Sequence, residues 1–165
     1  MNLWVERPKE EANLLNPAFC CSVLTASVSG YNSIEPKGMP FPLAFMVLPI
    51  TLHKRTREAL PINIRTSIAD WLEKNPDAKI QYYERVTSLI PFVREALLFG
   101  LDYKWFDIKE GGIIETMHTK PNVIRALKTS KREIAACIKQ SKFVGRWFAS
   151  AGSVQTVMTL WGIRP

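Results

Sequence analysis

The sequence is poor in the residues that build disulfide frameworks and metal sites. Its 165 residues include three cysteines and two histidines. Three is an odd number for a set of disulfides, and Cys20 and Cys21 are neighbours, which rarely pair with each other. His53 and His118 each lack a second histidine nearby, whereas a metal ion needs several ligands brought together. We therefore expect reduced thiols in a cytoplasmic protein, and neither a metal site nor another cofactor.

An apolar run long enough to cross a bilayer is also missing. The stretch from Gly38 to His53 contains no Asp, Glu, Lys or Arg and is mostly apolar. It is shorter than the about 20 residues of a spanning helix, and it contains Pro40, Pro42 and Pro49. Residues 6–11 are mostly charged, which interrupts the apolar segment that a signal peptide requires. We expect a soluble chain that has no membrane partner.

The common catalytic motifs are absent as well. No segment has the spacing of a P-loop, a dinucleotide-binding fingerprint or a nucleophile elbow. One polar cluster (Asp102, Asp107, Lys109 and Glu115) has the residue types with which some nucleases hold a divalent cation. Hairpins commonly carry such residues outward into solvent, and we favour that interpretation here. The sequence therefore predicts that the protein is not an enzyme.

What the chain does contain is a surplus of positive charge. Lys and Arg number 22 against 15 Asp and Glu, which gives a net charge of +7. Such a charge favours contact with nucleic acid or with an acidic protein surface. A hydrophobic content of 47% with 22% charged residues suits a globular protein of one domain. We expect an N-terminal helical arm over residues 1–15 and a single domain over residues 16–165.

Apolar residues at helical spacing predict a mainly helical domain. The expected helices cover residues 17–30, 42–52, 65–74, 78–100 and 130–150, with a last one starting at 153. Pro91 should kink or break the fourth of these helices near Ile90. Strands are expected at 104–109 and 113–117, because Gly111 and Gly112 can form the tight turn of a hairpin.

A long helix that leads into one hairpin is typical of a winged-helix unit. A plain helical bundle with an added hairpin has the same sequence pattern, so both architectures remain open at this point. We assign the fold class as mainly α with one β-hairpin, in a winged-helix-like single domain.

One predicted helix carries basic residues along a single side. At about 100° per residue, five cations fall within an arc of roughly 100°: Lys131, Arg132, Lys139, Lys142 and Arg146. The apolar residues of the helix fall on the opposite side, which should be buried. Such a row can contact a phosphate backbone or an acidic partner. The alternative is an ordinary solvated helix face, although Glu133 is the only acid on this helix.

Two segments of the sequence are more specific to a protein family than its overall composition is. One contains Gly38-Met39-Pro40-Phe41-Pro42 and continues to Leu60-Pro61, and the other contains Gly145-Arg146-Trp147-Phe148 and ends at Leu160-Trp161-Gly162-Ile163-Arg164-Pro165. Together with Asn16-Pro17-Ala18-Phe19, these segments resemble the middle component of bacterial three-component ABC systems, which look like the Lamassu class of antiphage defence. The resemblance extends from about Asn16 to Pro165.

The resemblance implies a small, non-catalytic accessory subunit. Such a subunit would act beside an SMC-like ABC ATPase dimer and a separate effector, often a nuclease. It would bridge the ATPase heads and the effector, and DNA contact through the complex is a further expectation.

Seven residues near these segments are candidates for contact with partners: Met39, Phe41, Lys54, Arg57, Trp147, Trp161 and Arg164. Tryptophan and arginine are enriched at the energetic centres of interfaces. Gly145, on the buried side of its helix, would allow close approach by a neighbour. The alternative is that the tryptophans and the glycine serve packing inside the domain.

A second function from another class also fits the residues. A free-standing winged-helix DNA-binding regulator would use the hairpin as a wing and the basic helix on phosphates. Binding of the isolated chain to duplex DNA separates this hypothesis from that of an accessory subunit, which alone should bind weakly.

Overall fold

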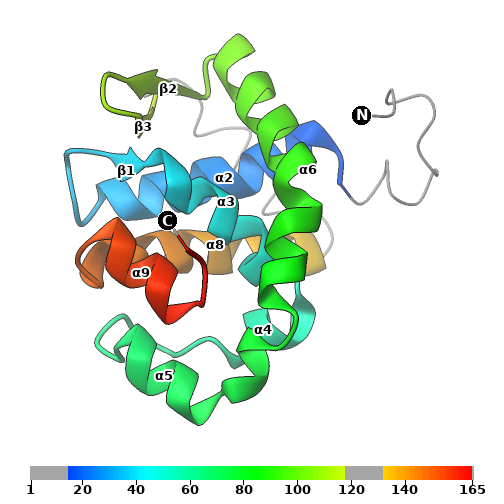
Figure 1. The fold of residues 1–165 in the computed structure, drawn as a ribbon. Coiled ribbons are helices and arrows are strands. Elements are labelled where there is room, and N and C mark those ends of the chain that lie inside the picture. Colours follow the sequence, from blue (N-terminus) through cyan, green and yellow to red (C-terminus); the bar gives the residue numbers. More distant parts are fainter. Residues whose placement is uncertain (1–14, 118–131, 165) are drawn as a thin grey trace.

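The computed structural model describes residues 15–117 and 132–164 and shows a mainly helical chain with a small sheet (Figure 1). The predicted N-terminal arm, His118 and Lys131 lie outside the described residues. The elements in chain order are α2 (Pro17–Asn32), β1 (Met39–Pro40), α3 (Phe41–Thr51), α4 (Lys54–Ala59), α5 (Ile68–Lys74), the 3-10 helix η2 (Pro76–Lys79), α6 (Tyr82–Asp102), β2 (Phe106–Lys109), β3 (Ile113–Thr116), α8 (Arg132–Ser150) and α9 (Val154–Leu160). No described helix is both long and apolar enough to span a membrane.

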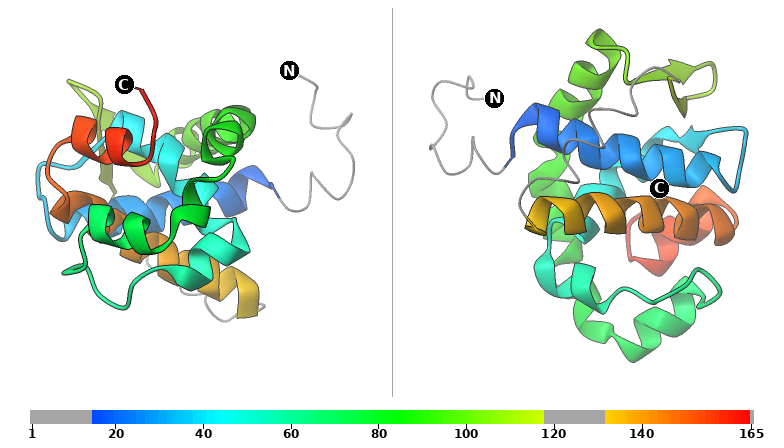
Figure 2. Two further views of the ribbon diagram at one scale, coloured as in Figure 1. Left: turned by 60° about the horizontal axis from the view of Figure 1, so that its bottom comes forward. Right: turned by 180° about the vertical axis from the view of Figure 1, so that it is seen from behind.

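Helix α2 forms the centre of the domain. It begins as predicted, with the Asn16 side chain accepting a hydrogen bond from the backbone N–H of Ala18 and with Pro17 at the first helical position. Nearly all its residues from Cys20 to Tyr31 are buried, because α3, α6, α8 and β3 all pack against it. Helices α6 and α8 lie on opposite sides of α2 and α3 (Figure 2, left).

Helices α2 and α8 cross at very short distance. A Cβ added to Gly30 would lie 2.1 Å from the carbonyl oxygen of Lys142, and one added to Gly145 would lie 1.9 Å from that of Ser27. The Ser141 hydroxyl donates a hydrogen bond to the Val23 carbonyl at 2.5 Å. The close neighbour of Gly145 belongs to the same chain, so this glycine serves packing inside the domain, which was the alternative interpretation.

The sheet has a third strand in addition to the predicted hairpin. Its order is β1-β3-β2, and both pairings are antiparallel, with Met39 opposite Ile114. Gly38 precedes β1 with a φ of +97°, and a Cβ there would lie 2.4 Å from a methyl carbon of Ile113. The long helix α6 leads directly into the hairpin (Figure 1), the order on which the winged-helix-like interpretation rests.

Two helix boundaries differ from the expected ones. The basic residues after α3 form a separate helix, α4, because the His53 ring accepts a hydrogen bond from the backbone N–H of Thr56 and caps a new start. The fourth predicted helix is interrupted at Gln81, which has a left-handed φ of 53°. Pro91 does not divide α6, since buried side chains on both sides of it, such as Val86 and Val93, anchor the two halves.

Four aromatic rings close the core on the side of α9. Trp161 packs against Tyr82 with ring centroids 4.5 Å apart and against Trp71 at 6.0 Å, while Trp71 meets Trp147 edge-on at 5.5 Å. Trp147 also donates its ring N–H to the carbonyl of Thr66 at 2.7 Å. This cluster joins α5, α6, α8 and α9, so it fixes the C-terminal part of the domain.

Candidate functional site

The outer side of α8 carries the predicted basic row. Arg132, Lys139, Lys142 and Arg146 are all exposed, and the fifth predicted member, Lys131, lies outside the described residues. The opposite side of the helix is buried and contains Cys137, Val144, Trp147 and Phe148. Packing against α2 thus determines which side of α8 faces outward, and the four cations share that side.

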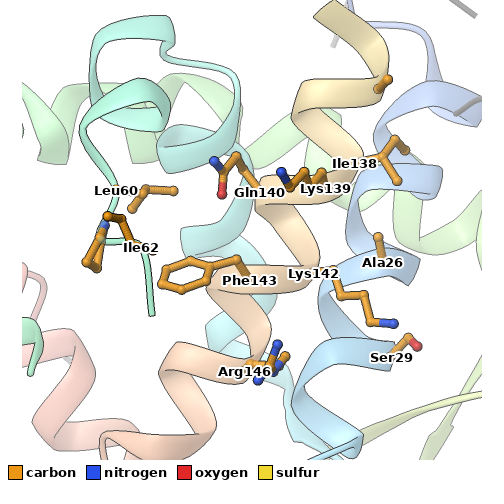
Figure 3. A pocket seen from close by; sticks show the side chains of 12 residues that line it. Ala26, Ser29, Leu60, Ile62, Ile138, Lys139, Gln140, Lys142, Phe143 and Arg146 are labelled. Atoms are coloured by element: carbon orange, nitrogen blue, oxygen red, sulfur yellow. The ribbon is translucent and has the colours of Figure 1, made fainter. Parts of the chain in front are cut away.

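Three of these cations line a groove of about 830 Å³ that runs along α8 (Figure 3). We call it the α8 groove. Helix α2 forms one wall with Ala26 and Ser29, and the loop after α4 forms the other wall with residues 60–62. The lining residues on α8 are Ala135, Ile138, Lys139, Gln140, Lys142, Phe143 and Arg146. The groove therefore combines cationic and apolar side chains.

The apolar part of the groove includes a side chain that the fold leaves uncovered. Ile62 is 100% exposed, although Leu60, two residues before it, is buried. Phe143 is half-buried and packs on Trp147 at 5.9 Å between ring centroids. The sequence does not predict that Ile62 is exposed in this groove, because an isolated isoleucine in a loop has no periodicity that marks it as exposed or buried.

The cations of the groove keep their charge available to a partner. Among the described residues, no carboxylate forms an ion pair with Lys139, Lys142 or Arg146. The only acid of α8, Glu133, instead pairs with Arg57 at 3.0 Å. The groove accordingly presents positive charge that the described part of the chain does not neutralise.

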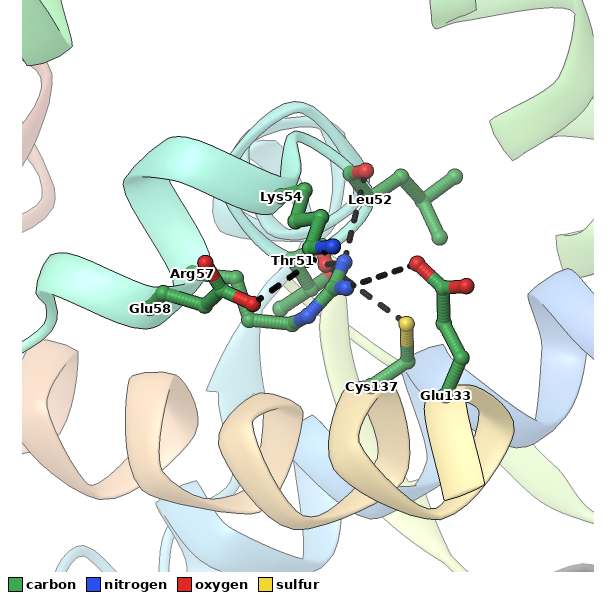
Figure 4. A network of polar contacts seen from close by, with 7 residues as sticks. All are labelled: Thr51, Leu52, Lys54, Arg57, Glu58, Glu133 and Cys137. Atoms are coloured by element: carbon green, nitrogen blue, oxygen red, sulfur yellow. Dashed lines mark hydrogen bonds and ion pairs between the residues drawn. The ribbon is translucent and has the colours of Figure 1, made fainter. Parts of the chain in front are cut away.

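Arg57 occupies a polar cluster between α4 and α8 (Figure 4). Its guanidinium is 4% exposed and donates to the carbonyl of Thr51 at 2.7 Å and to Glu133 at 3.0 Å. The Cys137 thiol donates weakly to the same carbonyl at 3.7 Å. Because Arg57 satisfies backbone groups at the end of α3 and reaches α8, its contacts hold three helices together.

The structure corrects four of the seven candidates for partner contact. The side chains of Met39, Arg57, Trp147 and Trp161 are buried inside the chain, at 0–4% exposure. They fill the core or its polar cluster, where a partner cannot contact them. The other three lie at the surface: Phe41 is half-buried against Phe45, whereas Lys54 and Arg164 are exposed.

Helix α6 has an outer side that also carries uncovered apolar residues. At about 100° per residue, Tyr83, Thr87, Arg94 and Leu98 fall within an arc of roughly 60°, and all four are exposed. We call these residues the α6 face. Tyr83 is 62% and Leu98 is 61% exposed. The sequence does not distinguish Leu98 from its buried neighbour Leu97, because two adjacent apolar residues leave it open which of them belongs to the apolar side of the helix.

The hairpin cluster is arranged as an internal ion pair. Asp107 and Lys109 project from the same side of β2, 3.0 Å apart. The hydrogen bond from Lys109 lowers the pKa of Asp107, and the same bond raises the pKa of Lys109. Within the described ranges, no group of three or more His, Cys, Asp or Glu residues could hold a metal ion.

The three thiols are buried among apolar side chains. Burial raises the pKa of Cys20 and that of Cys21 to about 12, and burial also raises the pKa of Cys137. A thiol becomes nucleophilic only as the thiolate. These cysteines therefore behave as small core residues, which agrees with their positions on the apolar sides of predicted helices.

The sequence as a whole matches a known family. Residues 4–165 fit the family described as "ABC-three component (ABC-3C) system Middle Component 3". The chain belongs to this middle-component family. No curated protein and no solved structure matches it. Membership confirms the resemblance to middle components of three-component ABC systems, and it identifies this middle component as one part of a system that has other components.

Proposed function

We propose that this middle component is a non-catalytic, cytoplasmic accessory subunit that bridges an SMC-like ABC ATPase dimer and a nuclease-type effector in Lamassu-type antiphage defence. Family membership over residues 4–165 carries the proposal. The ATPase heads would contact one face of the subunit, and the effector would contact another. Any contact with DNA would then be made through the assembled complex.

The positions of the exposed faces support a bridging role. Helices α8 and α6, which carry the α8 groove and the α6 face, lie on opposite sides of the central helices α2 and α3 (Figure 2, left). Each face contains apolar side chains that the described part of the chain does not cover, Ile62 on one and Leu98 on the other. Two separated faces allow two partners to bind at once without competing for the same surface.

The charge of α6 argues against insertion of this helix into a DNA groove. In a winged-helix-like unit, the long helix before the hairpin is the one that would enter a DNA groove. Here, however, the exposed side chains of α6 include Glu84 and Asp102 as well as Arg94. Protein contacts with DNA are dominated by cations that neutralise phosphates. The basic row lies on α8 instead, so α6 is better suited to a protein partner.

Co-purification tests the proposal. The tagged middle component would be expressed with each neighbouring component singly and with both together, and we expect it to retain each partner alone and to be required for their mutual association. If the ATPase and the effector bind each other equally well without it, or if neither is retained, the bridging role is refuted.

Variants of the α6 face sharpen this experiment. Tyr83→Ser combined with Leu98→Ser should release one partner and leave the other bound. Ile34→Ser, a change at an exposed isoleucine away from both faces, is the matched control and should retain both. Loss of both partners in the α6 variant, with the fold intact by circular dichroism, would contradict separate faces.

A further inference from the structure

We infer that the α8 groove binds an acidic segment of a partner protein, and that this segment inserts at least one apolar side chain between Ile62 and Phe143. This inference rests on the proposed function, because the partner is taken to be one of the other components of the system. It goes beyond that function by assigning a surface of the chain and the chemistry of what binds there.

The positive charge of the groove indicates that the partner segment is negatively charged. Lys139, Lys142 and Arg146 surround the groove, and no described carboxylate pairs with any of them. The neighbouring acid Glu133 is already held by Arg57. An acidic segment would gain complementary contacts and faster association here, whereas a basic segment would be repelled.

The apolar lining favours a protein over nucleic acid. Ile62 is fully exposed at the rim, and Leu60, Ile138 and Phe143 lie along the groove (Figure 3). Phosphates would satisfy the cations but would leave Ile62 in water. A side chain such as leucine or phenylalanine would bury Ile62, and removal of apolar surface from water stabilises the bound state.

The walls of the groove are well anchored. On one side, the backbones of α2 and α8 are in direct contact at Gly30 and Gly145. On the other side, the loop with residues 60–62 follows α4, which Arg57 ties to the end of α3 and to Glu133. A preformed surface binds with less loss of conformational entropy than one that must be ordered first.

Photo-crosslinking in the intact complex tests which molecule occupies the groove. A benzophenone amino acid would replace Gln140 within the groove, and in a control it would replace Lys37, which is exposed in the loop after α2. We expect an adduct from position 140 that maps to an acidic partner segment with a leucine, isoleucine, phenylalanine or tryptophan, and no such adduct from position 37.

Other adducts overturn the inference in distinguishable ways. An intact complex without an adduct from position 140, or an adduct with a neutral or basic segment, refutes it and leaves the proposed function standing. An adduct with DNA or RNA refutes it in favour of nucleic acid. Failure of the complex to form at all refutes the proposed function, and with it the inference that depends on it.

Charge reversal gives an independent measurement. The variant Lys139→Glu/Lys142→Glu/Arg146→Glu should bind the partner about tenfold more weakly or worse, and the wild-type affinity should fall with rising salt. The control Lys37→Glu/Lys74→Glu/Lys79→Glu makes the same change in net charge at exposed lysines outside the groove. Equal losses in the two triple variants would show that only net charge matters, and would overturn the assignment of the groove.

Discussion

The close crossing of α2 and α8 makes Gly145→Ala a sharp test of the fold. The new Cβ would lie 1.9 Å from the carbonyl oxygen of Ser27 and 2.9 Å from the backbone nitrogen of Tyr31, whereas real Cβ atoms essentially never come closer than 3.0 Å to such neighbours. The gap must therefore open by about 1 Å, and because both neighbours are backbone atoms, no side chain can rotate away.

The expected loss follows from opposing contributions. Overpacking of a tight core contact costs about 1–3 kcal/mol or more. Stretching the hydrogen bond from Ser141 to Val23 costs about 1 kcal/mol more. Alanine in place of glycine within a helix returns about 1 kcal/mol. We expect a net decrease of about 1–3 kcal/mol in the free energy of unfolding, measured by urea denaturation with circular dichroism.

Two further variants isolate the cause. Gly152→Ala places a Cβ in open space at a φ of +94°, so it should cost only the backbone strain of about 1 kcal/mol. Gly30→Ala places a Cβ on the other helix of the same contact, 2.1 Å from the carbonyl oxygen of Lys142. Once one alanine has separated the helices, the second should cost less, so the double variant should lose less than the sum. A stabilised Gly145→Ala protein with an unchanged fold would refute the crossing.

Three other changes test the polar cluster, the thiols and the helix cap. Arg57→Met should lower the free energy of unfolding by about 2–3 kcal/mol, because backbone carbonyls lose a buried donor. Glu133→Gln should cost less than about 1 kcal/mol in the same urea titration, since Glu133 is 70% exposed. Comparable losses would contradict this account. Cys20 and Cys21 should react with Ellman's reagent at the rate of unfolding, and immediate reaction of the native protein would show that they are not buried. Burial, followed by Arg85, Arg55 and Arg57, lowers the pKa of His53. The unfolded chain therefore binds the proton more readily, and stability that is present above about pH 6.5 is lost as pH falls below it. Denaturation midpoints at pH 7.5 and 5.5 should differ less in His53→Asn, and an equal difference would remove His53 from the explanation.

Local signals in the sequence were enough to predict much of the architecture. The Asn16-Pro17 start, the glycine pair of the hairpin and the apolar sides of the long helices are each encoded by neighbouring residues, and the structure confirms them. Strand β1 was missed because two residues, one of them a proline, cannot show the alternation that marks a strand. Its place in the sheet depends on a partner far along the chain.

The candidate site was less predictable, for a different reason. Trp147 and Trp161 were candidates for partner contact, and both belong to the core, because an interface and a core select the same residue types. Arg57 was another candidate, since buried arginines are rare unless they are paired. Only the tertiary structure shows its partner, Glu133, which lies 76 residues away in sequence.

The enclosure of α2 has a consequence for biosynthesis. Helix α2 ends at Asn32, whereas α8, which covers one side of α2, begins about 100 residues later at Arg132. At about 5–20 residues per second, a ribosome takes several seconds to make that stretch, during which an apolar helix lacks one of its walls. Exposed apolar surface of this kind binds chaperones or aggregates. Nascent chains that stop before residue 132 should therefore be trapped by chaperones, and the yield of soluble protein should depend on how quickly the second half of the chain follows the first.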